Sequence, residues 1–451
     1  MSEEGSRGTS DDRSKDSSVE DSTVLSDDLE TVIDLDLVTD RDRSGGDRWS
    51  MVVAGDCALN RDDEPTADRT VSSPLRERIG AADVSILNVE APIVSDAATP
   101  IDKSGPCVEN PDGTAETVAD VGFDVCTLAN NHVRDYGPEG VVTTLEALHD
   151  ADLATVGVGS TPDEAYEPLA VGPNGSTAIV NVCEQEFNLV DERGHGAAWF
   201  SDRRAREAIR AADREYDSVV VVAHSGVEYV PFPAPQLQGL LREFVDIGAD
   251  LVVGHHPHVP QGWERYGDGA IFYSLGNFLF DSMADEENTS WGLVLEVEFD
   301  GSTPVAVELV PTETVDGVVH PLGLTRDRED YLSYLNRLAE ITTDAATLEA
   351  YWQEIAVQVF YERYSNWLHT GVGANLSRAR SAPNDPRLQR SIWDPETRRA
   401  ELFVLLNVIR AESHRWLTTT ALEVLSGEGI DRRTPEVSGE AQRLLARTAR
   451  E

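Results

Sequence analysis

The sequence predicts an α/β protein with a largely buried sheet, followed by a helical C-terminal region. Short apolar runs recur from Trp49 to about residue 280, and each ends in small or polar residues. Amphipathic helical patterns separate many of these runs. After about Thr325 the strand-like runs stop and only helical periodicity remains. Nearly continuous apolar strands that alternate with helices are typical of a sheet covered by helices.

The expected elements follow in chain order. The predicted strands are WSMVVAGD, VSILNVE, FDVCTLANN, STAIVNVCE, SVVVVAHSG, ADLVVGHHPH and AIFYSLGNF, with WGLVLEVEFD and PVAVELVPTE as a later antiparallel pair. The helical patterns between them are PLRERIGAAD, TAETVADVG, PEGVVTTLEALHDAD, DRRAREAIRAADREY and APQLQGLLREFVDIG. Beyond residue 325, segments such as AATLEAYWQEIAVQVFYERYSNWL place Tyr, Trp, Leu and Phe on one side of a helix, so this region is expected to pack on the α/β body or on a partner.

These patterns divide the chain into three parts. Residues 1–46 are polar and acidic and bury too little apolar surface to order themselves, so they are predicted to be a disordered tail. Within that tail, TVIDLDLV is compatible with a short strand. Residues 47–324 form the predicted α/β domain, and residues 325–451 form the helical region.

The charge excludes some partners. The chain holds 82 acidic and 37 basic residues, for a net charge of -45. Only Lys15 and Lys103 are lysines. Duplex nucleic acid and anionic membranes are therefore not expected to bind. The acid excess resembles proteins of salt-loving archaea, because molar salt shortens the Debye length to roughly 3 Å and screens self-repulsion. We expect a haloarchaeal source, with an acidic mesophilic protein as the alternative.

Targeting signals and cysteine spacing narrow the class further. No basic segment precedes an apolar stretch at the N-terminus, and no apolar run reaches the roughly 18 residues of a membrane span. The expectation is a soluble, cytoplasmic protein without a signal peptide or membrane anchor. The four cysteines lack CxxC spacing, which predicts buried free thiols over disulfides or a zinc site.

Polar side chains gather where the predicted strands end. In an open α/β sheet the strand C-termini share one edge, and ligands bind beyond it. These polar residues are Asp56, Asn88, Glu90, Asn130, Asn131, His132, Asp135, His224, Glu228, His255, His256, His258 and Asn277. We expect them to converge.

Their chemistry points to a hydrolytic metal site. Neutral imidazoles, carboxylates and an amide oxygen suit Mn, Fe or Zn. Two ions roughly 3.5–4 Å apart can polarise a phosphoryl or acyl oxygen and generate hydroxide. A nearby non-ligand histidine can protonate the leaving group, contributing about 10²–10⁴-fold. Each motif alone also fits a structural role: a turn or cap for Asp56, a turn for Asn130–His132, and a satisfied strand-end histidine for His224. Their joint occurrence at six strand ends favours a site.

Several of these stretches carry a family resemblance. GDCALN, NVEAPI, ANNHVRDYG, HSGVEY and GHHPHVPQ…YSLGNFLFD, within about residues 49–312, resemble the CapA family of poly-γ-glutamate capsule biosynthesis proteins. The fold of that family is similar to calcineurin-like metallophosphoesterases, so the resemblance implies a layered α/β sandwich of that type. The acidic tail and the C-terminal helices lie outside it.

Roles follow from the metallophosphoesterase motifs Asp-x-His, Gly-Asp, Gly-Asn-His, a lone His and Gly-His-x-His. The resemblance implies that His132 is the general acid. The implied metal ligands are Asp56, Glu90, Asn131, His224, His256 and His258. His255 is the spare ring, exposed or supporting a ligand. Asp135 and Glu228 are expected to orient His132 and His224. Asn88, Asn130 and Asn277 are expected near the pocket. Arg61 and Arg134 are candidates to face an anionic group, with surface ion pairing as their alternative.

Two departures leave the metal number open. Cys57-Ala58 follows Asp56, so the histidine of Asp-x-His is missing. Asn88-Val89-Glu90 stands where Gly-Asp is expected and supplies a longer acid. One divalent ion or two are both compatible with this pattern.

The resemblance implies a metal-dependent hydrolase or transferase acting on a phosphoester or γ-glutamyl centre, in the making, export or attachment of an anionic polymer. Capsule-synthesis proteins would then be possible partners. Two alternatives stay open: a non-catalytic component that binds the polymer or a nucleotide, and a stand-alone cytoplasmic phosphatase.

Overall fold

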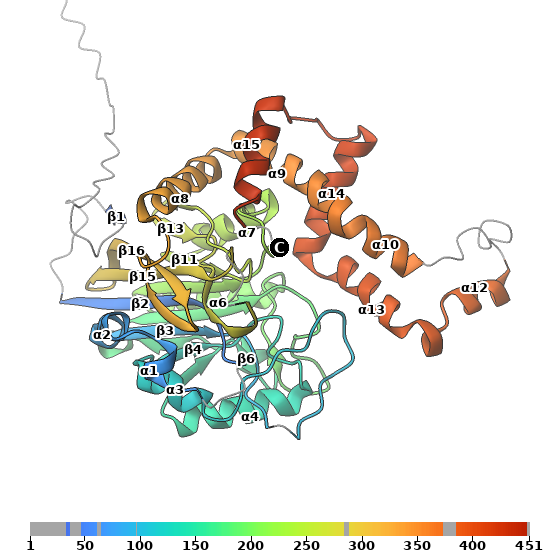
Figure 1. The fold of residues 1–451 in the computed structure, drawn as a ribbon. Coiled ribbons are helices and arrows are strands. Elements are labelled where there is room, and N and C mark those ends of the chain that lie inside the picture. Colours follow the sequence, from blue (N-terminus) through green and yellow to red (C-terminus); the bar gives the residue numbers. More distant parts are fainter. Residues whose placement is uncertain are drawn as a thin grey trace, which may run out of the picture.

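The computed structural model describes residues 33–36, 47–60, 65–95, 97–283, 288–372 and 385–448. Within them, two mixed sheets and their covering helices form an α/β body, and further helices follow at the C-terminus (Figure 1). The predicted layered α/β architecture with a helical C-terminal extension is confirmed.

The first sheet has the order β1-β16-β15-β2-β3-β4-β5, with β14 beside β2 and β17 beside β16. Strands β2, β3, β4, β5 and β14 run parallel, and β15 and β16 are the predicted antiparallel pair. The bounds are β1 Ile33–Asp36, β2 Arg48–Ala58, β3 Val84–Val89, β4 Val125–Thr127, β5 Ala154–Val156, β14 Asn277–Phe280, β15 Trp291–Asp300, β16 Thr303–Val315 and β17 Val318–Pro321. Strand β1 lies within TVIDLDLV; the rest of residues 1–46 falls outside the described residues.

The second sheet has the order β12-β13-β11-β10-β8-β7. Strands β6 and β9 pair with each other in a separate two-stranded sheet. Strands β8, β10, β11 and β13 run parallel. The bounds are β7 Leu169–Val171, β8 Thr177–Cys183, β10 Ser218–His224, β11 Leu251–His255, β12 Trp263–Tyr266, β13 Gly269–Phe272, β6 Val158–Gly159 and β9 Gly196–Ala197. Strands β8, β10 and β11 are buried along their whole length, as their continuous apolar runs predict.

Helices cover both sheets. Those of the α/β body are α1 Ala67–Thr70, α2 Ser73–Ala81, α3 Thr114–Val121, α4 Gly137–Asp150, α5 Pro162–Ala165, α6 Arg203–Glu215 and α7 Pro235–Asp246. Those of the C-terminal region are α8 Arg328–Thr343, α9 Ala345–Val359, α10 Ser365–Val372, α12 Pro386–Ile392, α13 Pro395–Arg410, α14 Glu412–Ser426 and α15 Pro435–Leu445, with a π-turn at Phe360–Tyr364. Short 3₁₀ turns lie at Pro173–Gly175 and Asp281–Met283.

The C-terminal helices share a core with the second sheet. Trp352 of α9 is buried in the same apolar cluster as Leu241 of α7 and Val252 of β11. The Trp352 indole N–H donates to Thr420 Oγ1 of α14 at 3.1 Å, so its polar edge is satisfied inside that core. The predicted packing of this region on the α/β body is confirmed.

The strands that carry the polar ends are divided between the two sheets. Asp56, Asn88 and Asn277 belong to the first sheet, whereas His224 and His255 end β10 and β11 of the second. The expectation of one shared sheet edge is therefore wrong. It failed because the apolar patterns of the strands do not reveal which strands pair. The site forms where the carboxyl ends of two parallel strand sets meet.

Candidate metal centre

Gly55 sets the position of the first acid, Asp56. A Cβ at Gly55 would lie 2.1 Å from the carbonyl oxygen of Gly276, so only glycine allows the segment before β14 to approach β2 this closely. The Asp56 N–H donates to that same oxygen at 3.0 Å. Asp56 and Asn277 consequently lie side by side as register partners.

The turn that follows β11 orients the histidine side chains of GHHPH toward the site. His256 and His258 adopt φ angles of 97° and 58°, in the left-handed region that residues other than glycine rarely occupy. Such backbone strain persists where surrounding contacts fix it, and it concentrates at functional sites. Both rings are buried, with centroids 6.0 Å apart.

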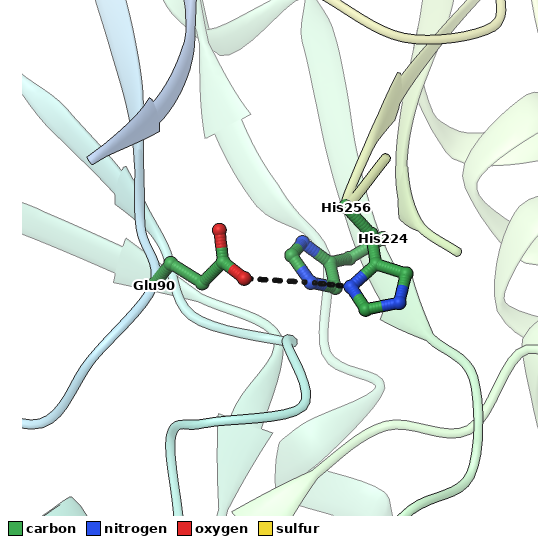
Figure 2. Close-up of side chains that lie close together, drawn as sticks. All are labelled: Glu90, His224 and His256. Carbon is green, nitrogen blue, oxygen red and sulfur yellow. Dashed lines mark hydrogen bonds and ion pairs between the residues drawn. The ribbon is translucent and has the colours of Figure 1, made fainter. Parts of the chain in front are cut away.

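The imidazoles form one cluster with His224. His256 Nδ1 lies 3.1 Å from His224 Nε2, and Asn131 Oδ1 lies 3.1 Å from the same His224 nitrogen. Glu90 Oε1 lies 3.5 Å from His224 Nε2 and 3.6 Å from His258 Nε2. Figure 2 shows the Glu90 carboxylate pointing across the site toward the rings of His224 and His256.

Asp56 anchors the opposite side of the cluster. Its carboxylate accepts from Asn88 Nδ2 at 2.7 Å and from the His256 N–H at 3.0 Å, and it lies 3.7 Å from His258 Nδ1. Burial raises the pKa of Asp56, but the hydrogen bond and electrostatic interaction with His255 bring that pKa below its usual range. Asp56 is therefore an anion, the form that a cation requires of its ligand.

Glu90 is the group that the protein leaves unsatisfied. Both carboxylate oxygens are buried, and neither has a hydrogen-bond partner among the described residues. Burial, followed by the negative charges of Asp56 and Glu228, raises the pKa of Glu90 well above its usual value. A buried polar group without a hydrogen-bond partner costs about 1–3 kcal/mol, and a charged one costs more. The Glu90 carboxylate therefore calls for a positively charged partner.

The donor set fits a divalent cation. Glu90, His224 and His256 offer one ligand atom each within 4.8 Å of one another, and so do Asp56, Glu90 and His258. Ligands held about 2.0–2.2 Å from a metal lie roughly 3–4 Å from each other, which matches the distances of 3.1–3.5 Å at His224 Nε2. Glu90 belongs to both groups, the position expected for a bridging acid. The described residues can thus hold one or two ions.

The side-chain amide of Asn277 determines which ring nitrogen of His258 faces the site. Asn277 Nδ2 donates to Thr289 O at 3.0 Å, so its Oδ1 is left to accept from His258 Nδ1 at 2.9 Å. The lone pair of His258 then lies on Nε2, toward Glu90. Burial lowers the pKa of His258, and burial with the charge of His256 lowers that of His224 further, so both rings are neutral.

His132 lies beside an acid, as predicted. Its Nδ1 is 2.6 Å from Asp135 Oδ2, and Lys103 forms an ion pair with the other Asp135 oxygen. Burial raises the pKa of Asp135, but the positive charges of His132 and Lys103 lower it below its usual value. An Asp135 carboxylate on Nδ1 leaves Nε2 of His132 to carry or release a proton. Lys103, one of two lysines in the chain, is buried here and was not singled out from the sequence.

Three further predicted residues have different outcomes. Asn130 shapes the turn: Nδ2 donates to Val89 O at 2.9 Å and Oδ1 accepts from the His132 N–H at 3.1 Å. His255 is buried, with Nδ1 3.1 Å from Asp56 Oδ1, so the expectation of an exposed ring is wrong and the supporting role remains. Arg61 lies outside the described residues.

Two further charged residues have partners that the sequence did not identify. Glu228 was expected to orient His224. Burial raises the pKa of Glu228, but the positive charges of His256 and Arg363 bring that pKa below the usual value. Its backbone oxygen accepts from Arg363 at 3.3 Å. Arg134 is buried and pairs with Asp191 Oδ1 at 2.9 Å, and the Asp191 side chain is 34% exposed, so the ion-pairing alternative holds for Arg134.

Two acids were missed. Glu184 and Glu186 follow β8 and form a third group with His256, with ligand atoms within 4.8 Å of one another. Glu184 Oε1 lies 3.2 Å from His256 Nε2, and its carboxylate also accepts from the Ser413 N–H and hydroxyl. The signal was present, because STAIVNVCE ends a strand in an acid like the other motifs. Ser413 lies in the helical region, which no sequence pattern connects to the site.

Protons compete with a cation at two of these groups. Burial lowers the pKa of His256, but the hydrogen bond and charge of Glu184 raise it to about 9. The pKa of Glu90 is also raised. His256 therefore holds a proton near neutral pH that it must lose to bind metal, and the raised pKa of Glu90 acts in the same direction.

We expect divalent metal to bind more tightly as the pH rises from 6 to 8, by up to about tenfold per unit for each proton displaced. Calorimetric titration of the metal-stripped protein with Mn²⁺, in two buffers of different ionisation enthalpy, measures both the affinity and the protons released. A dissociation constant that stays constant over this range, with no proton release, would contradict the assignment.

Comparison with known proteins decides the family. The family model for "Bacterial capsule synthesis protein PGA_cap" matches residues 50–282, more than half of the chain. The chain belongs to the PGA_cap family. The PGA_cap match contains Asp56, Glu90, the Asn130–Asp135 turn and all histidines of the cluster. It ends before the C-terminal helices begin.

Curated relatives of this PGA_cap chain include two capsule proteins. The Capsule biosynthesis protein CapA of Bacillus anthracis is 32% identical over 53% of the chain and 58% of that protein. The PGA biosynthesis protein CapA of Bacillus subtilis (strain 168) is 33% identical over 37% of the chain and 45% of that protein. The chain thus spans about half the length of these relatives. A solved 5'-nucleotidase from Candida albicans SC5314 is 13% identical, covering 64% of the chain and 57% of that structure with a TM-score of 0.34, a likeness that assigns no activity.

One structural feature bears on membranes. Among the helices of the described residues, none combines the length and apolar character that a bilayer crossing requires.

Proposed function

We propose that this PGA_cap protein is a metal-dependent hydrolase or transferase that acts on a phosphoester or γ-glutamyl substrate. One observation carries the proposal: within the described parts of the chain, the buried Glu90 carboxylate has no hydrogen-bond donor, and it faces the nitrogens of His224 and His258. A bound Mn²⁺, Fe²⁺ or Zn²⁺ would supply Lewis-acid polarisation of the scissile oxygen and acidify a water there.

The protein residues divide the remaining work. Asp56, Glu90, Asn131, His224, His256 and His258 would hold the cation, and Asn277, Asn88 and His255 would orient Asp56 and the rings. Asp135 accepts the Nδ1–H of His132, which leaves Nε2 as the position that would pass a proton to the departing oxygen or nitrogen. Lys103 keeps Asp135 ionised and so an acceptor for that N–H.

The names of the relatives support a substrate in an anionic-polymer pathway, as "PGA biosynthesis" and "Capsule biosynthesis" are said of the two Bacillus proteins. Assays of this chain are best run in molar KCl. A net charge of -45 repels anionic substrates at low salt, and molar salt screens that repulsion within roughly 3 Å.

The test begins with metal analysis of protein purified without added metal, followed by turnover of phosphomonoesters, phosphodiesters and γ-glutamyl amides with Mn²⁺. We expect His256→Ala to lose metal and turnover together, because it removes a ring whose Nδ1 faces His224 and whose Nε2 faces Glu184. His149→Ala is the matched control, since that exposed ring contacts Thr155 away from the cluster. Equal turnover and metal content in wild type and His256→Ala would overturn the proposal.

A further inference from the structure

A cavity lies beside the metal centre, where the C-terminal helices meet the α/β body. It has a volume of about 660 Å³, within the usual range of ligand pockets. Its lining residues include Arg134, Glu186, Phe187, Arg193, Phe403 and Arg410. Glu186 connects it to the metal centre, because this residue also belongs to the group with Glu184 and His256. We call this cavity the Arg410 cleft.

Helix α13 forms the outer wall of the Arg410 cleft. Phe403 packs edge-on against Phe187, with ring centroids 5.7 Å apart. Arg410 lies over the face of Phe187, 5.2 Å from its centroid, and donates to the backbone oxygen of Glu186 at 2.7 Å. These contacts hold the guanidinium in place beside the loop that follows β8.

The charge of the cleft is opposite to that of the molecule. Its lining holds four arginines (Arg134, Arg193, Arg399, Arg410) and three acids (Asp102, Glu186, Asp191), a net charge of 4 − 3 = +1 in a chain of net charge -45. Three of the arginines have a carboxylate partner: Arg134 and Arg193 share Asp191, and Arg399 pairs with Asp102.

Arg410 is the exception. Among the residues that the structure describes, no carboxylate forms an ion pair with it. Partial burial, followed by the charge of Arg193, lowers its pKa from the usual value. A partly desolvated guanidinium held beside a second arginine, in a protein with more than twice as many acids as bases, is ready to pair with an anion that the protein itself does not provide.

We propose that Arg410 binds an anionic group of the substrate, a carboxylate or a phosphate, while the reacting bond lies at the metal centre. The inference rests on the proposed function for the position of the reacting bond, but the binding itself needs no turnover. It assigns to the helical region, which lies outside the family match, a direct part in substrate recognition. A substrate would then carry at least one negative charge beyond the bond that reacts, as an oligomer of carboxylates or a polyphosphate does.

The test measures binding of tri-γ-glutamate and of tripolyphosphate by calorimetry at one fixed KCl concentration. We expect Arg410→Gln to weaken binding of at least one anion by about tenfold or more, the usual effect of losing a charge-assisted hydrogen bond. Arg390→Gln removes the same charge from an exposed position of α12 outside the cleft and should bind like wild type. The anion that responds identifies the recognised group.

A second pair of variants covers the case in which Arg410→Gln does not fold. Leu406 lines the cleft and is already exposed, so Leu406→Glu adds a negative charge there with little effect on packing. Leu422→Glu places the same charge at an exposed position of α14 that does not line the cleft. We expect only Leu406→Glu to weaken anion binding severalfold. The inference is overturned if wild type binds neither anion, or if the cleft variants bind as wild type does. Anion binding by wild type that depends on Arg410, without turnover of any substrate, would instead count against the proposed function and leave this inference standing.

Discussion

Glu90→Gln is expected to abolish stabilisation by metal without destabilising the metal-free protein. Burial and the charges of Asp56 and Glu228 raise the pKa of Glu90 and so favour the neutral carboxyl group in the metal-free protein, and glutamine is a neutral group of the same shape. We expect the free energy of unfolding without metal to change by less than about 0.5 kcal/mol. With Mn²⁺ at about 100 times its dissociation constant, wild type should gain roughly 2.7 kcal/mol, and the variant should gain almost none.

Urea unfolding of EDTA-treated protein, with and without Mn²⁺ in molar KCl, measures both quantities. Glu313→Gln is the matched control. Glu313 is also buried, but its carboxylate accepts backbone hydrogen bonds from Gly323 and Thr325. This control should therefore lose stability without metal and keep the full gain with metal. If Glu90→Gln gains as much from Mn²⁺ as wild type does, Glu90 is not a ligand.

His132→Ala is expected to lower kcat by about 10²–10⁴-fold while metal content stays at the wild-type level. The side-chain contacts that the structure gives for His132 are with Asp135 and Lys103, so its loss should leave the ligands in place. The phosphoester or γ-glutamyl amide that wild type turns over serves as substrate, and metal content is measured on the same samples.

A proton donor has a further signature that a structural residue lacks. Substrates whose leaving groups need no protonation, such as p-nitrophenolate, should be affected less than those with alkoxide leaving groups. Asp135→Asn should show the same pattern with a smaller loss, since the amide oxygen can still accept from the ring but carries no charge. A variant that loses metal along with turnover would assign His132 to the metal shell.

The sequence predicts this site well because its chemistry lies at strand ends. Asp56, His224 and His255 each terminate a buried apolar run, so the period of the strand pattern indicates where their side chains emerge. Which strands pair is set by contacts between segments far apart in the chain. That information is absent from local periodicity, and the division of the site between two sheets could not be predicted.

The parts that were missed depend on long-range contacts. Glu184 differs from an ordinary strand-end acid only through His256 and Ser413, which are respectively 72 and 229 residues away along the chain. Arg134 follows a motif and was expected to face an anion, but Asp191 reaches its guanidinium from a loop that no pattern singles out. Arg410 looks like any helix-terminal arginine until the fold places it beside Phe187.

Anomalous diffraction from crystals of the metal-stripped protein soaked in Mn²⁺ tests the central claim most directly. We expect a peak in contact with Glu90 and at least two of the rings of His224, His256 and His258, and its loss in crystals of Glu90→Gln. A soaked crystal with no peak among these side chains, or with Mn²⁺ bound only at surface acids, would contradict the account.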